Sequence, residues 1–509
     1  MERGSPVPNR SFILVALLLG TFLTAMEATV VSTAMPTIIG DLHGLNLYAW
    51  VFSIYLLTST ATVPLYGRLA DMVGRKPVFM CGIGIFLLGS ALSGLAQSMP
   101  ELIFFRAVQG LGAGAVQPTV FTILGDLYSL TERARIQGLF SAIWGTASVA
   151  GPALGAFITV SIGWRWVFYV NVPFGTVAAV LLWRTLHEAR QGRQHTLDYA
   201  GAATLTSGIA VLLFGLLGGS HGNVFPPAIV LAFLLLAAFV LIELRAREPV
   251  LPLGMFREPF IAIPCLAGLL IGAVQFGVSS YVPLFVQGVQ LGTAGDAGKA
   301  LAPLSLGWPL AGFVSPRLMI RFGFRPVAIL GTALVGIGTS VLVTYSLHTA
   351  LLLIVANLFV LGMGLGFSSN AFLLGAQDSV GWERRGVVTA SVQFTRTMGG
   401  TVGIALLGAV LNARLTTTLR AAGTADVNAV LNPSVRNALP PAVLRIVQNG
   451  LAAGLHQIYL LLAISAVGGF AVACFFPKGG GKSTIAEQPI NATVANVPRG
   501  RPSKAAAVE

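Results

Sequence analysis

Apolar residues along this chain come in long runs, and short polar segments separate the runs. A helix needs about 20 apolar residues to cross the hydrocarbon core of a bilayer. Runs near this length occur fourteen times, so the pattern predicts an all-α polytopic membrane protein. The expected spans are residues 11–35, 47–67, 77–97, 101–126, 136–160, 164–186, 199–218, 225–243, 259–286, 297–319, 327–347, 349–375, 387–412 and 454–476.

The two ends of the chain repeat each other. Three paired segments keep the same order and nearly the same offset, of 247, 249 and 252 residues. Repeated halves around a site near the middle of the membrane are a transporter architecture. We therefore expect two six-helix bundles, residues 11–187 and 246–476, and a linker, residues 188–245, with two additional transmembrane helices. The paired segments are VSTAMP (31–36) with VSSYVP (278–283), GRLADMVGRKP (67–77) with PRLMIRFGFRP (316–326), and GLGAG (110–114) with GMGLG (362–366).

Basic residues are distributed unevenly between the loops. With the N-terminus inside, 23 of the 31 Lys and Arg residues lie in cytoplasmic segments, 6 lie outside, and Arg106 and Arg396 lie within spans. Because cytoplasmic loops collect Lys and Arg, both termini are expected in the cytoplasm. The N-terminal segment 1–10 and a disordered tail, residues 477–509, would then be cytoplasmic, and the polar segment 413–453 would be an extracytoplasmic loop.

The composition agrees with a multi-pass protein of the cytoplasmic membrane. Charged residues make up 10% of the chain and hydrophobic residues 55%, with a mean hydropathy of +0.81, whereas soluble domains contain about 25% charged residues. The net charge of +13 would suggest a nucleic-acid partner in a soluble protein, but the basic cytoplasmic loops account for it, so no nucleic acid is expected. Cys81, Cys265 and Cys474 lack the spacing of metal ligands, so no metal site is expected.

Four motifs give the chain a resemblance to a known family. The segment GRLADMVGRKP resembles the signature loop of the major facilitator superfamily, between its second and third helices. LIFFRAVQGLGAGAVQP (102–118) resembles the fourth-helix motif, and WGTASVAGPALGA (144–156) resembles the fifth-helix antiporter motif, with Ala156 in place of its usual final glycine. WRWVFYVNVP (164–173) resembles the sixth-helix signature of the fourteen-helix drug:proton antiporter family. The residues that carry the first three motifs are Gly67, Asp71, Gly74, Arg75 and Lys76, then Arg106, Gln109, Gly110, Gly112 and Gly114, then Gly145, Gly151, Pro152 and Gly155.

The resemblance covers about residues 11–476 and implies a function. It implies the major facilitator fold and a proton-coupled antiporter that exports hydrophobic or amphipathic compounds by alternating access, as multidrug efflux transporters do. The expected partners are protons, these substrates and the lipid bilayer, and we expect a monomer. The proton gradient would drive transport without a cofactor. The segment GGGKST (479–484) is not an ATP-binding loop, because Phe476 stands where that motif needs its first glycine.

The signature loop is expected to act as a conformational latch, formed by Gly67, Asp71, Gly74, Arg75 and Lys76. The two glycines would allow a close crossing of helix ends. Asp71 would accept hydrogen bonds from a helix N-terminus or pair with an Arg of a neighbouring helix. Because Ile320 replaces Asp71 in the second copy, only the first half would keep the charged latch. The alternative is a loop whose basic residues only hold it in the cytoplasm.

Glu27 and Arg106 are the charged residues expected to couple transport to protons. A charge at the centre of a membrane helix costs between about 2.5 and 10 kcal/mol. Burial favours the protonated form of a carboxylic acid, so Glu27 would hold a proton when occluded and release it when wetted. Arg106 stays charged and needs partners, namely backbone carbonyls, Gln109 or a carboxylate. Glu27 aligns with Val274, so the proton chemistry is expected in the first half. The alternatives are a fixed buried ion pair and a structural function for Arg106.

Small and polar residues within the spans predict packing and cavity positions. Small residues let a neighbouring backbone approach closely, and Pro152 would kink its helix. The packing positions are Gly110, Gly114, Gly151 and Gly155, and Gly399 and Gly403 repeat the last spacing in the second half. The possible cavity polar groups are Gln109, Gln275, Asn370, Gln393 and Arg396.

Other functions are compatible with parts of this pattern. The same fold would serve a transporter of one defined endogenous solute or lipid, although the antiporter motif argues against import. A membrane sensor without transport is a further alternative, and it predicts no need for Glu27. No arrangement of nucleophile, base and orienting residue stands out, so the chain is not expected to be an enzyme.

Overall fold

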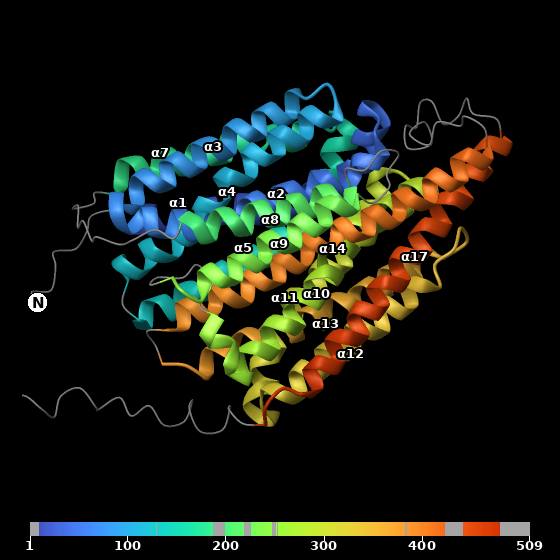
Figure 1. Cartoon of the computed structure of the whole chain (residues 1–509). Helices are drawn as coiled ribbons and strands as arrows, with labels where there is room; N and C mark the ends of the chain where they lie inside the picture. The colour runs from blue at the N-terminus through green and yellow to red at the C-terminus, as the bar shows by residue number, and fades with distance from the viewer. Residues whose placement is uncertain are drawn as a thin grey trace, which may run out of the picture.

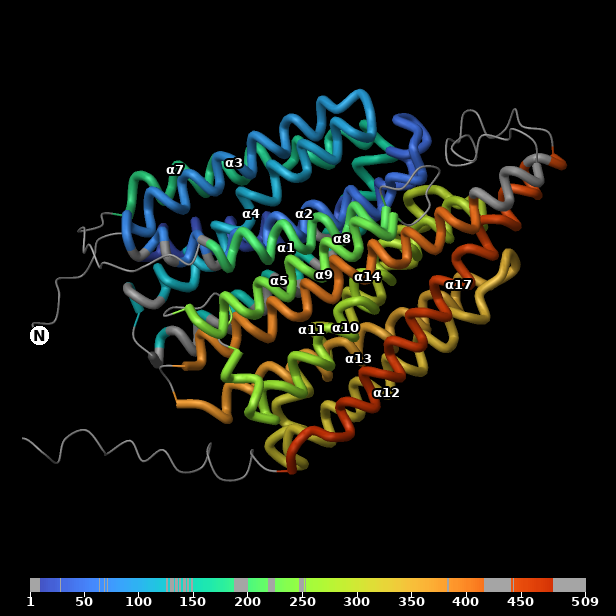
Figure 2. Tube along the Cα trace, viewed as in Figure 1, coloured from blue at the N-terminus to red at the C-terminus, as the bar shows by residue number. Residues whose placement is uncertain are grey.

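The computed structural model shows an elongated bundle whose long helices run roughly side by side (Figure 1). Figure 2 follows the same path of the chain along its Cα atoms. Within the described residues the chain is helical and has no strand, which confirms the expected all-α class. Most of the expected N-terminal segment and tail lies outside these residues. The structure describes residues 10–128, 130–186, 199–217, 225–246, 251, 253–381, 384–422 and 441–478.

The helices follow the order that the apolar runs predict. The first expected bundle contains α1 (Arg10–Leu42), α2 (Tyr48–Val73), α3 (Arg75–Leu95), α4 (Met99–Leu127), α5 (Leu130–Ser161), α6 (Trp166–Tyr169) and α7 (Asn171–Thr185). The linker contains α8 (Tyr199–Leu217) and α9 (Pro226–Glu243). The second expected bundle contains α10 (Pro259–Leu284), the π-helical turn η4 (Phe285–Val289), α11 (Ala294–Phe322), α12 (Phe324–Val343), α13 (Leu351–Asp378), α14 (Arg385–Ala422) and α17 (Pro441–Cys474).

Twelve of the described helices are long and apolar enough to cross a membrane. The other two expected spans correspond to α5 and α11, which have 32 and 29 residues but are less apolar. These two helices pack against each other. Because each covers part of the other, they need less apolar surface than a helix surrounded by lipid. Fourteen membrane-crossing helices therefore stay a prediction, which the lengths of α5 and α11 fit.

The expected loop 413–453 is helical at both of its ends. The helix α14 continues past the expected span as far as Ala422, and α17 begins at Pro441. The intervening residues 423–440 lie outside the described part of the chain. The apolar runs underestimated these two helices, because a helix can extend beyond the bilayer with polar residues that hydropathy does not count.

The linker helices lie at the seam between the two halves. The helix α8 packs against α2 of the first half and α14 of the second, and α9 packs against α8 (Figure 1). Large apolar side chains on α9 are exposed, which is the surface that a helix presents to lipid. These side chains are Val230, Leu231, Phe233, Leu234, Val240 and Leu241.

The internal repeat is visible in how the two glycine-rich helices pack. A Cβ atom on Gly114 of α4 would lie 2.5 Å from the carbonyl oxygen of Ser59 in α2. A Cβ atom on Gly366 of α13 would lie 2.6 Å from the carbonyl oxygen of Trp308 in α11. Each helix therefore approaches its neighbour backbone to backbone at the same repeat position. The same relation holds for Gly110 with α2 and Gly362 with α11, and for Gly112 with α3 and Gly364 with α12.

The G-x-x-x-G faces of α5 and α14 also pack alike. A Cβ atom on Gly155 would lie 2.5 Å from the carbonyl oxygen of Val30 in α1, and one on Gly403 would lie 2.6 Å from Cβ of Ala273 in α10. Pro152 lies inside α5 between the two glycines of its face. The other glycine of each face, Gly151 or Gly399, makes an equally close approach to the same neighbour.

The two signature loops each turn at a glycine. Gly74 joins α2 to α3 with φ +103°, and Gly323 joins α11 to α12 with φ +88°, a region that L side chains rarely adopt. Gly67 differs from this pair. It lies inside α2, and a Cβ atom there would meet nothing within 4 Å. In this conformation Gly67 therefore allows no close helix crossing, in contrast to the expectation from the motif.

Hydrogen bonds join the two halves at one end of the bundle. Gln287 of η4 contacts α1, because its Nε2 donates to the carbonyl oxygen of Thr33 at 3.0 Å and its Oε1 accepts from Thr37 at 3.2 Å. Nδ2 of Asn412 in α14 donates to the carbonyl oxygen of Asn46 at 2.8 Å. These residues lie in the C-terminal parts of α1 and α14 and beside the start of α2. The count of basic residues predicts that this end faces the outside of the cell.

Candidate functional site

Glu27 lies midway along α1 and forms an ion pair with Arg106 of α4. The two side chains are 1% and 2% exposed, so both charges are shielded from solvent in this conformation. A buried charge is tolerated only when it is paired and hydrogen-bonded. The two residues expected from the sequence to couple transport to protons are therefore in direct contact.

Arg106 has polar partners for more than one face of its guanidinium group. Nη1 also donates to Oε1 of Gln109 at 2.7 Å, and Nε lies 3.5 Å from the carbonyl oxygen of Val51 in α2. The guanidinium carbon lies 4.2 Å from the centre of the Tyr55 ring, within the range of a cation–π contact. A carboxylate, an amide and a carbonyl are the partners expected from the sequence. The aromatic ring is an addition that only the structure shows.

Asn171 is a further partner of the Glu27 carboxylate, and it was not among the site residues expected from the sequence. Its Nδ2 donates to Oε2 of Glu27 at 2.7 Å and lies 3.0 Å from Oγ of Ser90 in α3. The Ser90 hydroxyl in turn donates to the carbonyl oxygen of Phe168 at 2.8 Å. Asn171 belongs to the motif WRWVFYVNVP. A single amide in this largely apolar segment is the feature by which the sequence could have identified it.

Close packing of α3 on α4 positions part of this network. A Cβ atom on Gly89 would lie 2.6 Å from Cα of Gln109, so only glycine allows this approach of the two backbones. Gly89 directly precedes Ser90, and Gln109 lies one turn beyond Arg106. The glycine therefore brings the backbone of α3 beside Ser90 close to the backbone of α4 at Gln109. Five helices contribute to the resulting Glu27 cluster, which consists of Glu27, Tyr55, Ser90, Arg106, Gln109 and Asn171.

Two buried polar atoms beside the ion pair have no hydrogen-bond partner in the described part of the chain. They are Nε2 of Gln109 and Oδ1 of Asn171, one donor and one acceptor. Buried polar groups are normally satisfied by protein or by an ordered water. The cluster thus combines one carboxylate, one permanent cation and two amide atoms that can accept further hydrogen-bond partners. The described residues contain no group of three or more His, Cys, Asp or Glu arranged to bind a metal ion.

Lys76 of the signature loop contacts another helix of the first half, α7. Nζ of Lys76 donates to the carbonyl oxygen of Trp183 at 2.7 Å and lies 4.8 Å from the centre of the Trp183 ring. This carbonyl is near the C-terminal end of α7, where a cation is favoured. The second copy of the loop makes an equivalent contact. Nη2 of Arg325 donates to the carbonyl oxygen of Cys474 at the end of α17, at 2.6 Å. The backbone of Asp71 belongs to α2, but its side chain lies outside the described part of the chain.

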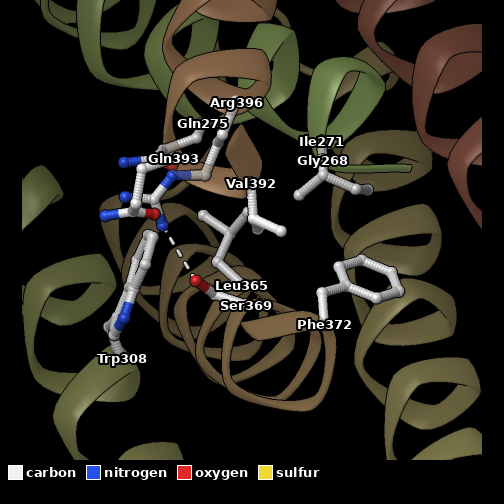
Figure 3. A pocket seen from close by; sticks show the side chains of 10 residues that line it. All are labelled: Gly268, Ile271, Gln275, Trp308, Leu365, Ser369, Phe372, Val392, Gln393 and Arg396. Atoms are coloured by element: carbon white, nitrogen blue, oxygen red, sulfur yellow. Dashed lines mark hydrogen bonds between the residues drawn. The ribbon is translucent and has the colours of Figure 1, made fainter. Parts of the chain in front are cut away.

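A second polar cluster lines a recess in the C-terminal half (Figure 3). It contains Gln275 of α10, Gln393 and Arg396 of α14, and Ser369 of α13, beside the Trp308 ring of α11. Nη1 of Arg396 donates to Oγ of Ser369 at 2.8 Å. Three of the five possible cavity groups therefore share this C-terminal recess.

The other two expected cavity groups lie elsewhere. Gln109 belongs to the Glu27 cluster and is fully buried. Asn370 donates to Oγ of Ser315 at 3.0 Å and is not among the residues that line the recess. Asn370 follows Ser369 directly, so successive residues of one helix point in different directions. Sequence alone does not distinguish the two.

Comparisons with known proteins agree with this architecture. Residues 17–404 match the family model described as Major Facilitator Superfamily. The chain is 37% identical over 423 residues to the multidrug transporter protein MdtP of Bacillus subtilis (strain 168), with 81% of this chain and 77% of that protein covered. It is 32% identical over 495 residues to multidrug resistance protein 3 of the same organism, with 94% and 97% covered.

A solved structure shares the fold at low sequence identity. It is a bacterial homologue of the human lysosomal transporter Spinster in an inward-facing and unoccupied conformation. The TM-score is 0.67 at 18% identity, and the match covers 93% of this chain and 98% of that one.

Proposed function

Because this chain belongs to the major facilitator superfamily, we propose that it is a proton-coupled antiporter that exports hydrophobic or amphipathic compounds by alternating access. It is a multi-pass protein of the cell membrane and a transporter of small molecules. Efflux of several compounds is supported by the names of the two Bacillus subtilis relatives, which describe multidrug transport and multidrug resistance.

The observation that carries the proton coupling is the sealed Glu27 cluster. Both oxygens of the carboxylate have a donor, Arg106 on Oε1 and Asn171 on Oε2. Protonation of Glu27 removes the charge that attracts Arg106, so it weakens the ion pair. Arg106 keeps Gln109 and the carbonyl of Val51 as partners when this happens. Binding and release of one proton thus changes the contacts between α1 and α4.

The contacts between the halves support a transporter closed on its outer side. Gln287 and Asn412 hold the halves together at the end assigned to the outside. The helices α5 and α11 meet at the same end, where a Cβ atom on Gly298 would lie 2.9 Å from the carbonyl oxygen of Pro152. A state closed on the outer side is the one in which an exporter takes up its substrate from the cytoplasm. The opposite state requires these contacts to separate.

The proton gradient is large enough to drive such a cycle. One proton moving inward supplies about 2.3 kcal/mol per 100 mV of membrane potential. It supplies a further amount of about 1.4 kcal/mol per pH unit. Exchange for an uncharged compound uses both terms, whereas exchange for a monovalent cation uses only the pH gradient.

Transport in proteoliposomes with the Glu27→Gln variant tests the proposal. Glutamine keeps the size and hydrogen bonding of the side chain but cannot carry the proton. We expect this variant to lose uphill export driven by a pH gradient and to keep exchange of labelled for unlabelled substrate. The matched control is Glu101→Gln, the same change at an exposed position near the start of α4.

Undiminished uphill export by Glu27→Gln would falsify the assignment of Glu27. A panel of substrates in the same vesicles separates multidrug export from transport of one defined solute or lipid. Export of several unrelated compounds supports the proposal, and export of a single compound class supports the alternative.

A further inference from the structure

We infer that the C-terminal recess is a subsite for the anionic head, such as a carboxylate, of an amphipathic substrate. The inference rests on the proposed function, because it names the class of substrate that the exporter accepts. Three of the four helices that line the recess, α10, α11 and α14, also pack against the N-terminal half. The subsite therefore belongs to helices that change their contacts as the halves move.

Arg396 gives the recess a positive charge, and no carboxylate of the described residues forms an ion pair with it. Its described partners are the hydroxyl of Ser369 at 2.8 Å and the face of Trp308, whose ring centre lies 5.7 Å from the guanidinium carbon. Arg106 in the other half is different, because Glu27 pairs with it. Arginine is always ionised in proteins. Among the described residues, Arg106 thus has a carboxylate partner and Arg396 has a hydroxyl partner.

Unused hydrogen-bonding atoms face the same recess. Nε of Arg396 and Oε1 of Gln275 are buried and have no hydrogen-bond partner among the described residues. Figure 3 shows the guanidinium group beside the Gln275 and Gln393 side chains and the Trp308 ring. A carboxylate forms charge-assisted hydrogen bonds with an arginine through two of its N–H groups. With Nη1 on Ser369, Nε is available for such a bond.

The opposite side of the recess is apolar. Ile271, Val392 and Phe372 lie across from the polar group (Figure 3). The cavity volume is about 10 Å³, which is the space of about one water molecule. In this conformation the recess holds no more than a water-sized group, so a ligand can enter only when α10, α11 and α14 move and widen it. A polar head beside Arg396 and an apolar body against Phe372 describe an amphipathic anion.

Export of an anion also has an electrical consequence. A proton moving inward and a monovalent anion moving outward both carry positive charge in the same direction. The cycle would then move two charges inward, and a membrane potential that is negative inside would drive both.

Equilibrium binding of three matched probes tests the subsite without any gradient. The probes are 1-naphthaleneacetate, its uncharged amide, and 2-(1-naphthyl)ethylamine, measured by calorimetry on the full chain in nanodiscs. Wild type is expected to bind the carboxylate more tightly than the amide, and Arg396→Gln is expected to weaken carboxylate binding by about 10- to 100-fold. Binding of the amide should stay the same. The control is Arg317→Gln, the same change at an exposed arginine of α11, which should alter neither.

Arg396→Lys is a second variant, which tests the same inference if Arg396→Gln does not fold. It keeps the charge but loses the fork of N–H groups, so the preference for the carboxylate should shrink without disappearing. Equal weakening of all three probes, or tighter binding of the amine than of the carboxylate by wild type, overturns the inference. These results do not depend on proton coupling. Failure of the antiport proposal in the Glu27→Gln experiment is therefore distinguishable from failure of this one.

Discussion

Asn171 donates a hydrogen bond of 2.7 Å to Oε2 of Glu27, across a separation of 144 residues in the chain. The same amide lies 3.0 Å from the hydroxyl of Ser90. Both side chains bonded by this amide are buried, and the amide itself is fully buried. Asn171 therefore links the carboxylate of α1 to α3 and α7, and Arg106 is not its only support.

Asn171→Ala is expected to lower both stability and proton-driven transport. Loss of the amide leaves Glu27 and Ser90 short of a buried hydrogen bond, so the unfolding free energy should fall by about 1–3 kcal/mol. It also removes the donor to Oε2 of the carboxylate, so the Glu27 side chain is held less firmly and uphill export should slow. Thermal unfolding in detergent and uphill export in proteoliposomes measure the two effects.

Asn357→Ala is the matched control for this variant. Asn357 is a buried amide in the other half, and its Nδ2 donates to the carbonyl oxygen of Gly338 at 3.0 Å and to the Tyr345 hydroxyl at 3.1 Å. Its removal should cost similar stability and slow uphill export less than Asn171→Ala does. If the two variants slow uphill export equally, Asn171 has only a structural function.

Removal of Arg106 alone is expected to destabilise the protein more than removal of the whole ion pair. Arg106→Gln leaves a buried carboxylate without its partner, and loss of one member of a buried pair costs about 3–5 kcal/mol. The double variant Glu27→Gln with Arg106→Gln removes both charges and should be more stable than Arg106→Gln. Thermal unfolding of the two single variants and the double variant gives the coupling energy. A double variant whose loss equals the sum of the two single losses contradicts the assignment of the pair as one energetic unit.

Two glycines of the motifs are expected to respond differently to alanine. Gly155→Ala would place a Cβ atom 2.5 Å from the carbonyl oxygen of Val30, a backbone atom that cannot move away easily. We expect it to separate α1 from α5 and to lower both folding yield and transport. Gly67→Ala would place a Cβ atom in open space within a helix, which adds about 0.5–1 kcal/mol of stability.

Transport by Gly67→Ala then tests the latch. If Gly67 must allow a close helix crossing in the outward-facing state, the variant folds normally but transports poorly. Transport equal to wild type shows that the signature loop does not need this glycine. Yield, thermal unfolding and initial transport rates of both alanine variants are the measurements.

The architecture was predictable because it depends on properties that are local along the chain. The bilayer sets a minimum length for each apolar run, so the helices could be counted before any packing was known. The internal repeat was visible as a constant offset, and Gly114 and Gly366 make equivalent close contacts in the two halves. Glu27 and Arg106 stood out because a charge in an apolar run is unfavourable unless a partner is present.

Only the tertiary structure decided which partners these residues have. Glu27 meets Asn171 because α7 turns a particular face toward α1, and Asn171 in turn meets Ser90 of α3. The local sequence of one helix does not specify the face of another. For the same reason Arg396 and Asn370 were equal candidates in the sequence, but they lie in different surroundings. The length of an apolar run and the free-energy cost of a charge within it are properties of each segment by itself. The hydrogen-bond partners of Glu27 and of Arg396 depend on how the helices pack against one another.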